Sequence, residues 1–551
     1  MLMSSFCCFG EKKMGQSGSA PVPGQIVETT SGKIRGRLYT IDEDRVVEGF
    51  LGIPYAEPPI GELRFQKPIP KQKWKHTLDC FHFGPRCPQA DEYFSGYLNI
   101  VGKDEAKCLT LNIFAPQWES KEFPSGHPVM IWIHGGGFQM HSSSNYGDRT
   151  LARNLCAKDL LVVSINYRLG LFGFFTTGDE ACRGNMGLWD QTLALEWVRD
   201  NIGKFGGDPN NVTVFGQSAG GASSDLLSLS PHSRDLFHKV IPMAGCGECD
   251  FAIRSSDEQT QISKDFAKFL GYKPHEEEGN EEMLEWLRCQ YAELLELGLS
   301  GKKGFGKPGR LLFTPNIDGE FFPKSIEELR KEAPRKPRMT GVTQHEGLFF
   351  VGLTGLNKTY EGMQRYLERS ITDDSYEGAQ KLREQTLEFY FSDVNTKDKK
   401  EVIKKIVQIW GDREINYGIW EMARKEAELG SKVYLYQFNY FNPDGFGLLK
   451  WILPFLGATH CSELRYILGK GVISKFQPNA NDHKMIKIMT DFFSNFAKYG
   501  DPNGKTEKCL WEPHDHTKPN RHLTITLEPS MQDSFIENRM ELWSKVFRAR
   551  L

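Results

Sequence analysis

The fold of this chain is decided by the stretch Val214-Phe215-Gly216-Gln217-Ser218-Ala219-Gly220-Gly221. The run Asn211 to Phe215 is short and apolar and predicts a buried strand, and the run Ala222 to Leu229 predicts a helix. A serine between a strand and a helix, flanked by two glycines, is typical of a nucleophile elbow, because the glycines leave room for the crossing backbone. The stretch therefore predicts that Ser218 is a nucleophile at the carboxyl end of a strand.

Two further strands and a helix are predicted upstream of this elbow. Val129 to Ile133 and Leu160 to Ile165 are apolar runs rich in β-branched residues. Leu188 to Phe205 carries apolar residues at helical spacing, until Gly206-Gly207-Asp208-Pro209 breaks it. This alternation of strand and helix predicts an α/β fold with a mostly parallel central sheet and helices on both faces, whose ligand sites lie at the carboxyl ends of strands.

A glycine-rich loop follows the first of these strands. It reads His134-Gly135-Gly136-Gly137-Phe138 and precedes the elbow by roughly 80 residues. Such a loop offers backbone N–H groups to a developing oxyanion, so Gly136 and Gly137 are predicted donors, with the Ala219 amide as the third. Elbow and loop together predict the α/β-hydrolase fold.

A serine hydroxyl needs a histidine to take its proton and a carboxylate to orient that histidine. In this fold the chain order is serine, acid, histidine. Glu346 and Asp318 both satisfy that order, and nine histidines follow Ser218. The residues alone therefore leave the acid and the base open.

Several separate segments resemble one known family. Phe50 to Gly61, Leu63-Arg64-Phe65, Asn166-Tyr167-Arg168 and Gly184 to Leu188 are similar to signatures of the carboxylesterase/cholinesterase family, also called type-B carboxylesterases and lipases. The resemblance runs from about Gln25 to the end. It implies an α/β-hydrolase that cleaves carboxylic esters through an acyl-enzyme, with neither cofactor nor metal.

The resemblance also selects two triad members. Glu346, in Gly341 to Gly347, occupies the position of the family's acid, and His460, in Pro454 to His460, that of its histidine. His345, beside the acid, is interpreted as an incidental neighbour. The predicted triad is Ser218, Glu346 and His460.

Some positions depart from the family pattern. Gln217 stands where cholinesterases and many mammalian carboxylesterases carry glutamate. No tryptophan lies between Cys87 and Cys108, where cholinesterases stack choline. We therefore expect a non-cholinesterase member. Ala244 and Cys461 replace the usual serine and glycine. Arg64 lacks its expected acidic partner unless Glu105 replaces it.

Composition limits the function classes. The 551 residues carry a formal net charge of -3 without a basic excess, which disfavours nucleic-acid binding. The richest apolar window, Trp451 to Leu456, is too short to span a bilayer. We expect a flexible leader over residues 1–24 and one catalytic domain over 25–551. Amphipathic helices are predicted to form a cap, at Glu281 to Leu297, Lys381 to Phe391, Lys397 to Ile409 and Arg413 to Glu428.

The expected compartment is the cytoplasm. Glu11, Lys12 and Lys13 interrupt any signal-peptide core, so most of the 12 cysteines are expected as thiols. Cys87 and Cys108 resemble a pair that secreted members of the family join, and the sequence leaves open whether they are oxidised. Two alternatives stay open. Cys7, Cys8 or Gly15 would anchor the chain to a membrane if lipidated, and the terminal Ala549-Arg550-Leu551 loosely resembles a peroxisomal address. The sequence leaves the oligomeric state open.

Two rival functions also stay open. One is a lipase or lipid-ester hydrolase whose acyl pocket would draw on Phe349, Phe350, Trp451, Leu453 and Phe455. The other is a non-catalytic adhesion or ligand-binding member of the family. Such members usually lose the nucleophile, and this chain keeps Ser218.

Overall fold

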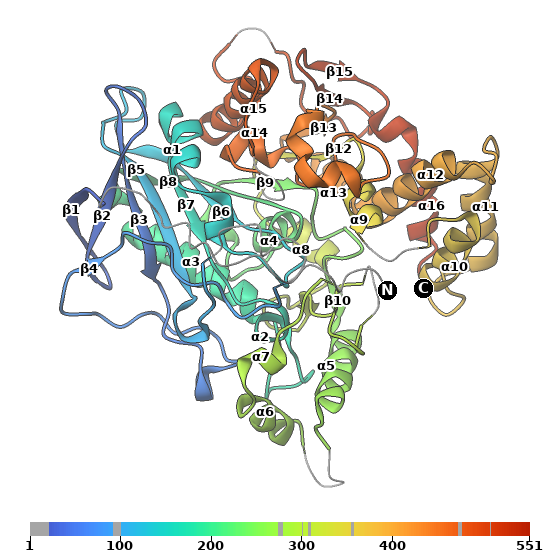
Figure 1. Ribbon diagram of the computed structural model, residues 1–551, viewed down its shortest axis with the longest axis horizontal. Coiled ribbons are helices and arrows are strands. Elements are labelled where there is room, and N and C mark those ends of the chain that lie inside the picture. Colours follow the sequence, from blue (N-terminus) through green and yellow to red (C-terminus); the bar gives the residue numbers. More distant parts are fainter. Residues whose placement is uncertain are drawn as a thin grey trace, which may run out of the picture.

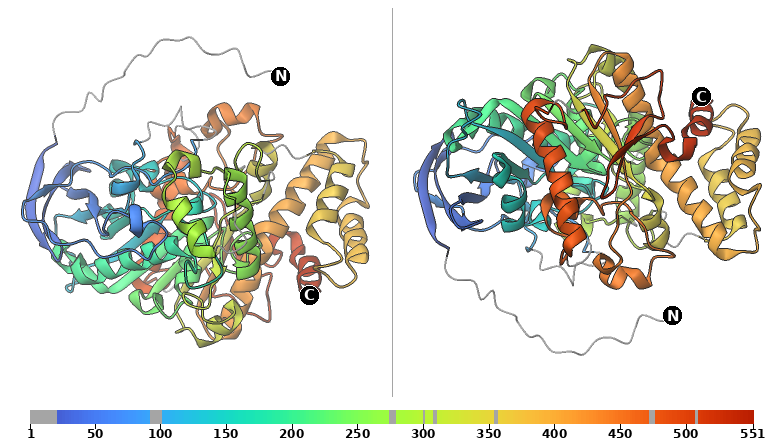
Figure 2. Two further views of the ribbon diagram at one scale, coloured as in Figure 1. Left: turned by 90° about the horizontal axis from the view of Figure 1, so that it is seen from below. Right: turned by 90° about the horizontal axis from the view of Figure 1, so that it is seen from above.

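The fold is that of a computed structural model, which describes residues 21–91, 101–273, 279–299, 301–306, 310–353, 357–471, 476–506 and 509–551 (Figure 1). A large twisted sheet runs through the molecule. Figure 2 shows helices packed on both of its faces. Cys7, Cys8 and Gly15, the candidate sites of lipidation, lie outside the described residues.

The central part of the sheet is parallel and its two ends are antiparallel. The strands follow the order β1-β2-β3-β5-β7-β6-β8-β9-β12-β13-β14-β15, with β4 beside β2, and β10 and β11 pair separately. Every pair from β7 to β14 is parallel. The strands are β1 (Pro23–Thr29), β2 (Gly32–Thr40), β3 (Val46–Pro54), β4 (Leu78–Asp79), β5 (Thr110–Pro116), β6 (His127–Ile133), β7 (Leu161–Ile165), β8 (Gly207–Gln217), β9 (Lys239–Met243), β10 (Arg254–Ser255), β11 (Asn316–Ile317), β12 (Arg338–Thr343), β13 (Val433–Phe438), β14 (His522–Ile525) and β15 (Ser530–Gln532).

The predicted strands are present, with shifted ends. The strand expected at Asn211 to Phe215 is β8, which begins earlier and runs up to the nucleophile. β1 begins at Pro23, which pairs with Arg37 of β2. Residues 23 and 24, expected in the flexible leader, therefore belong to the sheet, because pairing with β2 gives them partners that the sequence does not reveal.

The helices are α1 (Arg149–Asn154), α2 (Gly170–Phe174), α3 (Met186–Asn201), α4 (Ala219–Leu227), α5 (Ser256–Leu270), α6 (Asn280–Arg288), α7 (Ala292–Leu295), α8 (Ile326–Glu332), α9 (Glu346–Leu353), α10 (Tyr360–Ser370), α11 (Ala379–Phe391), α12 (Lys399–Gly411), α13 (Tyr417–Glu428), α14 (Leu464–Leu468), α15 (Ala480–Tyr499) and α16 (Met540–Arg548). Alternate side chains of β6 enter two separate cores: Ile131 packs in the core of α3 and α4, and Trp132 in that of α15. The sheet is therefore buried on both faces.

The helix expected over Glu281 to Leu297 is interrupted, so that prediction is wrong at its centre. α6 ends at Arg288 and α7 begins at Ala292. Between them, the Arg64 guanidinium donates to the carbonyls of Arg288 at 3.0 Å and Gln290 at 2.7 Å. These long-range bonds take carbonyls that a continuing helix would have used, and the helical pattern of the sequence cannot reveal them.

The insertion between β12 and β13 holds α9 to α13 and lies beside the sheet (Figure 1). The helices expected at Lys397 to Ile409 and Arg413 to Glu428 are α12 and α13, joined without a loop by a π-helical turn over Asp412–Asn416. α12 packs on α9 through the close approach of Gly347 to the Val407 carbonyl. The predicted cap over the site stays a prediction.

Candidate active site

The nucleophile elbow is formed as predicted. Ser218 follows β8 with a φ of 61° and ψ of -127°, a conformation that a residue with a side chain rarely adopts. Its N–H donates to the Met243 carbonyl at 2.8 Å, and its carbonyl accepts from the Ala222 N–H at 2.8 Å. The backbone therefore fixes Ser218 between the central strand β9 and the first turn of α4.

Three glycines make this turn possible. A Cβ on Gly216 would lie 2.3 Å from the Gly220 carbonyl oxygen, and one on Gly220 would lie 2.1 Å from that of Ile133. A Cβ on Gly221 would meet the Met243 carbonyl oxygen at 2.6 Å. Because each obstacle is backbone, it cannot rotate away, and only glycine fits.

The glycine-rich loop lies directly against the elbow. A Cβ on Gly135 would approach the Cβ of Ser218 to 3.2 Å. Gly136 and Gly137 have φ of 112° and 60°, which turns their amides out of any strand pairing. In the described part of the chain, the amides of Gly136, Gly137 and Ala219 have no hydrogen-bond acceptor. Unused N–H groups beside a nucleophile suit an oxyanion.

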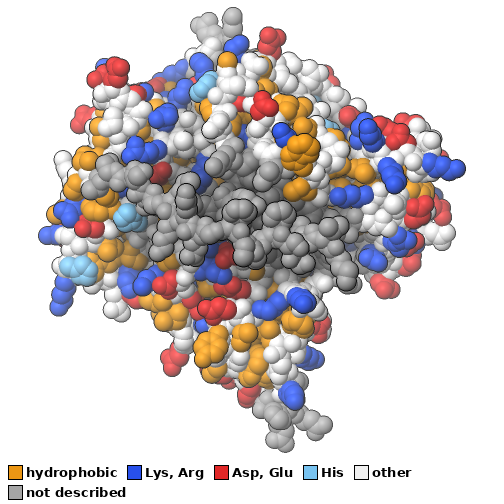
Figure 3. Space-filling view, viewed as in Figure 1, with side chains coloured by type: hydrophobic (Ala, Val, Ile, Leu, Met, Phe, Trp, Pro, Cys, Tyr) orange, Lys and Arg blue, Asp and Glu red, His pale blue; other side chains and the backbone are white. Residues whose placement is uncertain are grey.

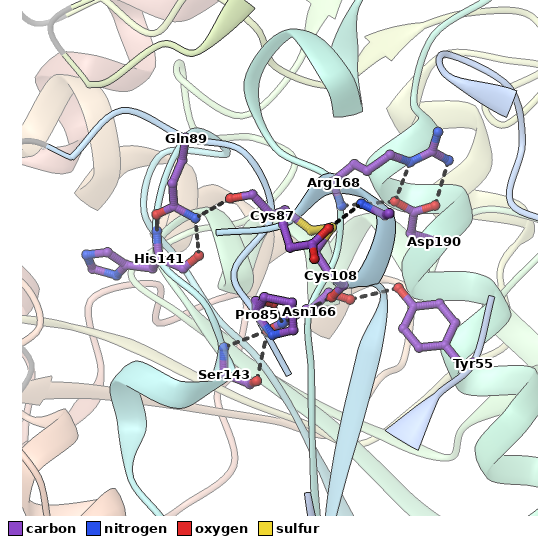
Figure 4. Close-up of a disulfide and its surroundings, with 12 residues drawn as sticks. Tyr55, Pro85, Cys87, Gln89, Cys108, His141, Ser143, Asn166, Arg168 and Asp190 are labelled. Carbon is purple, nitrogen blue, oxygen red and sulfur yellow. Dashed lines mark hydrogen bonds and ion pairs between the residues drawn. A yellow bond between two sulfur atoms is a disulfide. The ribbon is translucent and has the colours of Figure 1, made fainter. Parts of the chain in front are cut away.

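A polar network behind this loop holds it in place (Figure 4). Asn166 donates to the Cys108 carbonyl at 3.1 Å and accepts from the Ser143 N–H at 2.9 Å. The Tyr167 hydroxyl donates to the His134 carbonyl at 2.7 Å. Asn166 and Tyr167, from the segment that resembles a family signature, therefore brace the chain around the glycine loop.

Cys87 and Cys108 are joined in a disulfide, drawn in Figure 4. The sequence left the oxidation state of this pair open, and in the structure the two sulfurs are bonded. The bond closes a sequence separation of 21 residues. The other cysteines of the described residues, Cys289 among them, are free.

Glu346 and His460 lie against each other in the protein interior. His460 Nδ1 is 2.5 Å from Glu346 Oε2, and Glu346 Oε1 accepts from the Thr343 N–H at 2.6 Å. Both side chains are buried. Because Nδ1 donates its proton to the carboxylate, Nε2 is the nitrogen free to act as a base.

The competing acid and histidine lie elsewhere. Asp318 accepts from the N–H groups of Glu320 and Phe322 in its own turn. The ring of His345 packs edge-on against Phe455. Of the two acids that chain order left open, only Glu346 contacts His460.

Ser218 and His460 are neighbours without a direct hydrogen bond between them among the described residues. Gln217, the residue before the nucleophile, contacts the histidine, with its Nε2 at 3.3 Å from both ring nitrogens of His460. In enzymes without bound substrate, such catalytic hydrogen bonds are often long and tighten only on binding.

Three polar residues at this site were not assigned a role from the sequence. Gln217 contacts His460, and the Cys461 thiol donates to Gln217 Oε1 at 3.0 Å. Glu463 is buried, and its Oε2 has no hydrogen-bond partner among the described residues. The sequence did point to Gln217 and Cys461, because both depart from the family pattern at positions next to triad residues.

Burial controls the protonation of two of these groups. Burial, reinforced by the nearby Glu346 carboxylate, raises the pKa of Glu463 to about 8. Burial and the carboxylates of Glu463 and Glu346 also raise the pKa of the Cys461 thiol well above its usual value. Both groups are therefore protonated at neutral pH.

Aromatic side chains form one wall beside His460. The Phe350 ring lies 4.9 Å from the His460 ring and stacks on Trp410 at 4.2 Å. Leu453 is buried, whereas Trp451 is 79% exposed. Trp451 is thus a poor candidate for the acyl pocket in which we placed it.

Glu105 replaces the missing partner of Arg64. Its carboxylate accepts from Arg64 Nε at 2.7 Å and Nη2 at 2.6 Å. The same guanidinium donates to the segment between α6 and α7. The Arg64–Glu105 pair therefore joins the N-terminal part of the chain to the segment between α6 and α7.

One cluster has the composition of a metal site. Ligand atoms of Asp225, Cys246 and Glu248 lie within 4.8 Å of one another. However, Arg330 donates to Asp225 and Glu248 at 2.7 Å each, and Arg338 donates to Asp225 at 2.7 Å. Although burial acts to raise it, the two guanidinium groups lower the pKa of Asp225 to about 2. The cluster is a buried ion-pair network, with its carboxylates already neutralised.

Known proteins resemble the chain over nearly its full length. Residues 23–543 match the model of the carboxylesterase family. The chain is 46% identical to esterase cest-33 of Caenorhabditis elegans, over 97% of this chain and 96% of that protein. It is 33% identical to carboxylesterase 5A of Felis catus, over 96% and 94% of the two chains. It is 30% identical to the medium-chain fatty acyl-CoA hydrolase precursor of Anas platyrhynchos, over 94% and 92%.

These matches confirm the predicted family and the predicted α/β-hydrolase fold. The three relatives reported above are named esterase, carboxylesterase and fatty acyl-CoA hydrolase, and none of them is named a cholinesterase. Together with the elbow, they identify the chain as a serine hydrolase of carboxylic esters. The chain belongs to the carboxylesterase family.

Proposed function

We propose that the chain hydrolyses esters through an acyl-enzyme on Ser218, with His460 as general base and Glu346 as its orienting acid. Gly136, Gly137 and Ala219 are the oxyanion donors in this proposal. Its main support is the 2.5 Å contact of His460 Nδ1 with Glu346, next to an elbow whose neighbouring amides have no acceptor in the described chain.

The reaction has two halves. Ser218 Oγ attacks the ester carbonyl while His460 Nε2 takes its proton, and the oxyanion accepts from the three amides. His460 then protonates the departing alcohol, and water repeats the cycle on the acyl-enzyme. Glu346 stabilises the imidazolium that forms in each half.

The test combines active-site labelling with one variant. A fluorophosphonate probe is expected to label Ser218 in the folded protein and to leave Ser218→Ala unlabelled. His460→Ala is expected to lose turnover while keeping the wild-type circular dichroism spectrum. Absence of labelling in the folded wild type would favour the non-catalytic binding member, and turnover by His460→Ala would remove His460 from its role.

For the substrate, we propose a small-molecule ester with an apolar acyl or alcohol group. The Phe350 ring beside His460, backed by Trp410, supports an apolar group close to the reacting carbonyl. Rates on p-nitrophenyl esters from acetate to palmitate test this proposal. A maximum at the longest chains would favour the lipid-ester hydrolase, and cleavage of a medium-chain acyl-CoA would extend the activity named for the duck relative.

Binding to nucleic acid has no support on the face shown in Figure 3, where acidic and basic side chains are interspersed. No helix within the described ranges combines the length and the apolar character that crossing a membrane requires. The oligomeric state stays open.

We propose the cytoplasm as the working compartment, with one catalytic domain that includes the whole of β1 and thus begins at residue 23 instead of the expected residue 25. Free cysteines among the described residues support a reducing environment, and the Cys87–Cys108 disulfide argues against it. The peroxisomal alternative stays open: the Leu551 N–H donates to the Ser375 carbonyl at 3.0 Å, while Leu551 is 77% exposed. Fractionation of cells, with alkylation of thiols before lysis, tests both compartment and disulfide.

A further inference from the structure

Two side chains that the proposed reaction does not use meet beside the histidine. Gln217 precedes the nucleophile and Cys461 follows His460. The Cys461 thiol donates to Gln217 Oε1 at 3.0 Å, and Gln217 Nε2 lies 3.3 Å from both His460 ring nitrogens. The three side chains therefore form a chain from thiol to amide to imidazole.

The amide nitrogen of Gln217 lies over the face of the His460 ring. A nitrogen 3.3 Å from both Nδ1 and Nε2 cannot lie in the ring plane, because it would overlap the carbon between them. An amide N–H is the positive end of its dipole, and the face of a neutral aromatic ring is negative. The contact therefore favours neutral imidazole and disfavours imidazolium.

The Cys461 thiol determines which end of the amide faces the ring. As a donor, it selects the amide oxygen and leaves the nitrogen for His460. Burial keeps the thiol protonated by raising its pKa, so the donor persists over the working pH range. Without this thiol, the amide would be free to turn its oxygen toward the ring.

The backbone at Cys461 indicates that its side chain has a use. Its φ is 67°, in the left-handed region that favours glycine. A glycine there would relieve the strain, and the family pattern carries glycine at this position. Strained non-glycine residues persist where the side chain contributes something else.

We infer that Gln217 and Cys461 are positioning residues for His460: the thiol orients the amide, and the amide holds the imidazole ring in its neutral, proton-accepting form. This inference rests on the proposed role of His460. A glutamate at position 217 would stabilise imidazolium instead.

The test is the pH dependence of kcat/KM on p-nitrophenyl butyrate. Gln217→Glu and Cys461→Gly are each expected to move the acidic limb upward by about one pH unit, because a base that binds its proton more tightly is lost at higher pH. Since glycine relieves the backbone strain, Cys461→Gly is also expected to melt at or above the wild-type temperature. A merely structural Cys461 would give a lower melting temperature and an unmoved limb.

Cys461→Ser is the matched control, because its hydroxyl can donate the same hydrogen bond. It is expected to return the acidic limb toward the wild-type position relative to Cys461→Gly. Superimposable pH profiles for wild type, Gln217→Glu and Cys461→Gly would overturn the inference. If His460→Ala is inactive in the same assay, only the inference fails, whereas an active His460→Ala would remove the proposed function itself.

Discussion

The two halves of the candidate site are held in different ways. At the elbow, residues 216–221, position depends on backbone: glycines pack against the carbonyls of Ile133 and Met243. At the histidine loop, residues 454–463, position depends on contacts from distant parts of the chain. There Phe349 N–H donates to Thr459 Oγ1 at 3.0 Å, and His345 N–H donates to the Ala458 carbonyl at 2.9 Å.

The two modes of positioning differ in how well the sequence predicts the residues of a site. A backbone-determined turn needs particular residues at fixed local spacing, so it leaves a readable motif. A loop held by tertiary contacts needs only compatible partners far away, so it leaves almost none. Substitutions in the elbow and in the histidine loop should therefore differ in how strongly they change activity and stability.

The largest effect is expected from Ser218→Ala, which removes the chemistry of the elbow without its turn. We expect kcat to fall about 10⁶-fold, as when a nucleophile is lost from a comparable triad. Because alanine can keep the backbone contacts of Ser218, the melting temperature should stay within a few degrees of wild type. Steady-state kinetics and thermal denaturation measure the two quantities. A substantial residual rate would assign the nucleophile elsewhere.

On the histidine side, Glu346→Gln keeps the volume of the acid and removes its charge. The amide can present a donor to His460 Nδ1 and favour the wrong tautomer, so we expect kcat to fall about 10⁴-fold. KM should change little, because Glu346 is buried behind the histidine. Single-turnover kinetics with p-nitrophenyl acetate separate the two constants, and a loss confined to KM would contradict the assignment.

A matched pair of glycines compares the two halves directly. Gly220→Ala places a Cβ 2.1 Å from a backbone oxygen of Ile133, whereas Gly457→Ala places one 2.6 Å from the His345 side chain. We expect the free energy of unfolding to drop by about 3 kcal/mol in the first variant and about 1 kcal/mol in the second, because a side chain can move aside. Chemical denaturation measures both, and equal losses would remove the proposed contrast.

The smallest effect concerns Glu463 in the histidine loop. In the folded protein, burial raises the pKa of Glu463 to about 8, from an ordinary glutamate value of 4.5. Between these values the unfolded chain releases the proton that the folded chain keeps, so stability falls as pH rises from about 4.5 to 8. Glu463→Gln should flatten this slope, so that its stability relative to wild type is higher at pH 8.5 than at pH 5. Denaturation midpoints at pH 5 and 8.5 measure it, and parallel profiles would refute it.

The fold was largely predictable from the sequence. β6, β7 and the second half of β8, from Val212 on, are buried on both faces and largely apolar, so their existence was readable. The ends were not readable, because β1 and β8 extend wherever a neighbouring strand supplies partners. The break between α6 and α7 arises from Arg64, more than 200 residues away, and no local pattern encodes it.

The candidate site divides in the same way. Ser218 and the glycines followed from local chemistry, and the structure forms that turn. Glu346 and His460 were chosen by resemblance, and their contact is a tertiary fact. Gln217 and Cys461 stood out as departures from the family pattern beside the triad, but their contact, across 244 positions, followed from no local pattern.

The buried ion-pair network also links the insertion to the hydrolase body. Arg330 of α8 donates to Asp225 of α4 and to Glu426 of α13, each at 2.7 Å. The helix that starts behind the nucleophile and the last helix of the insertion thus share one charged residue. Detaching either helix would leave an uncompensated charge in the interior, at a cost of several kcal/mol. At this end, the insertion is therefore held by buried charge to the helix that follows the nucleophile.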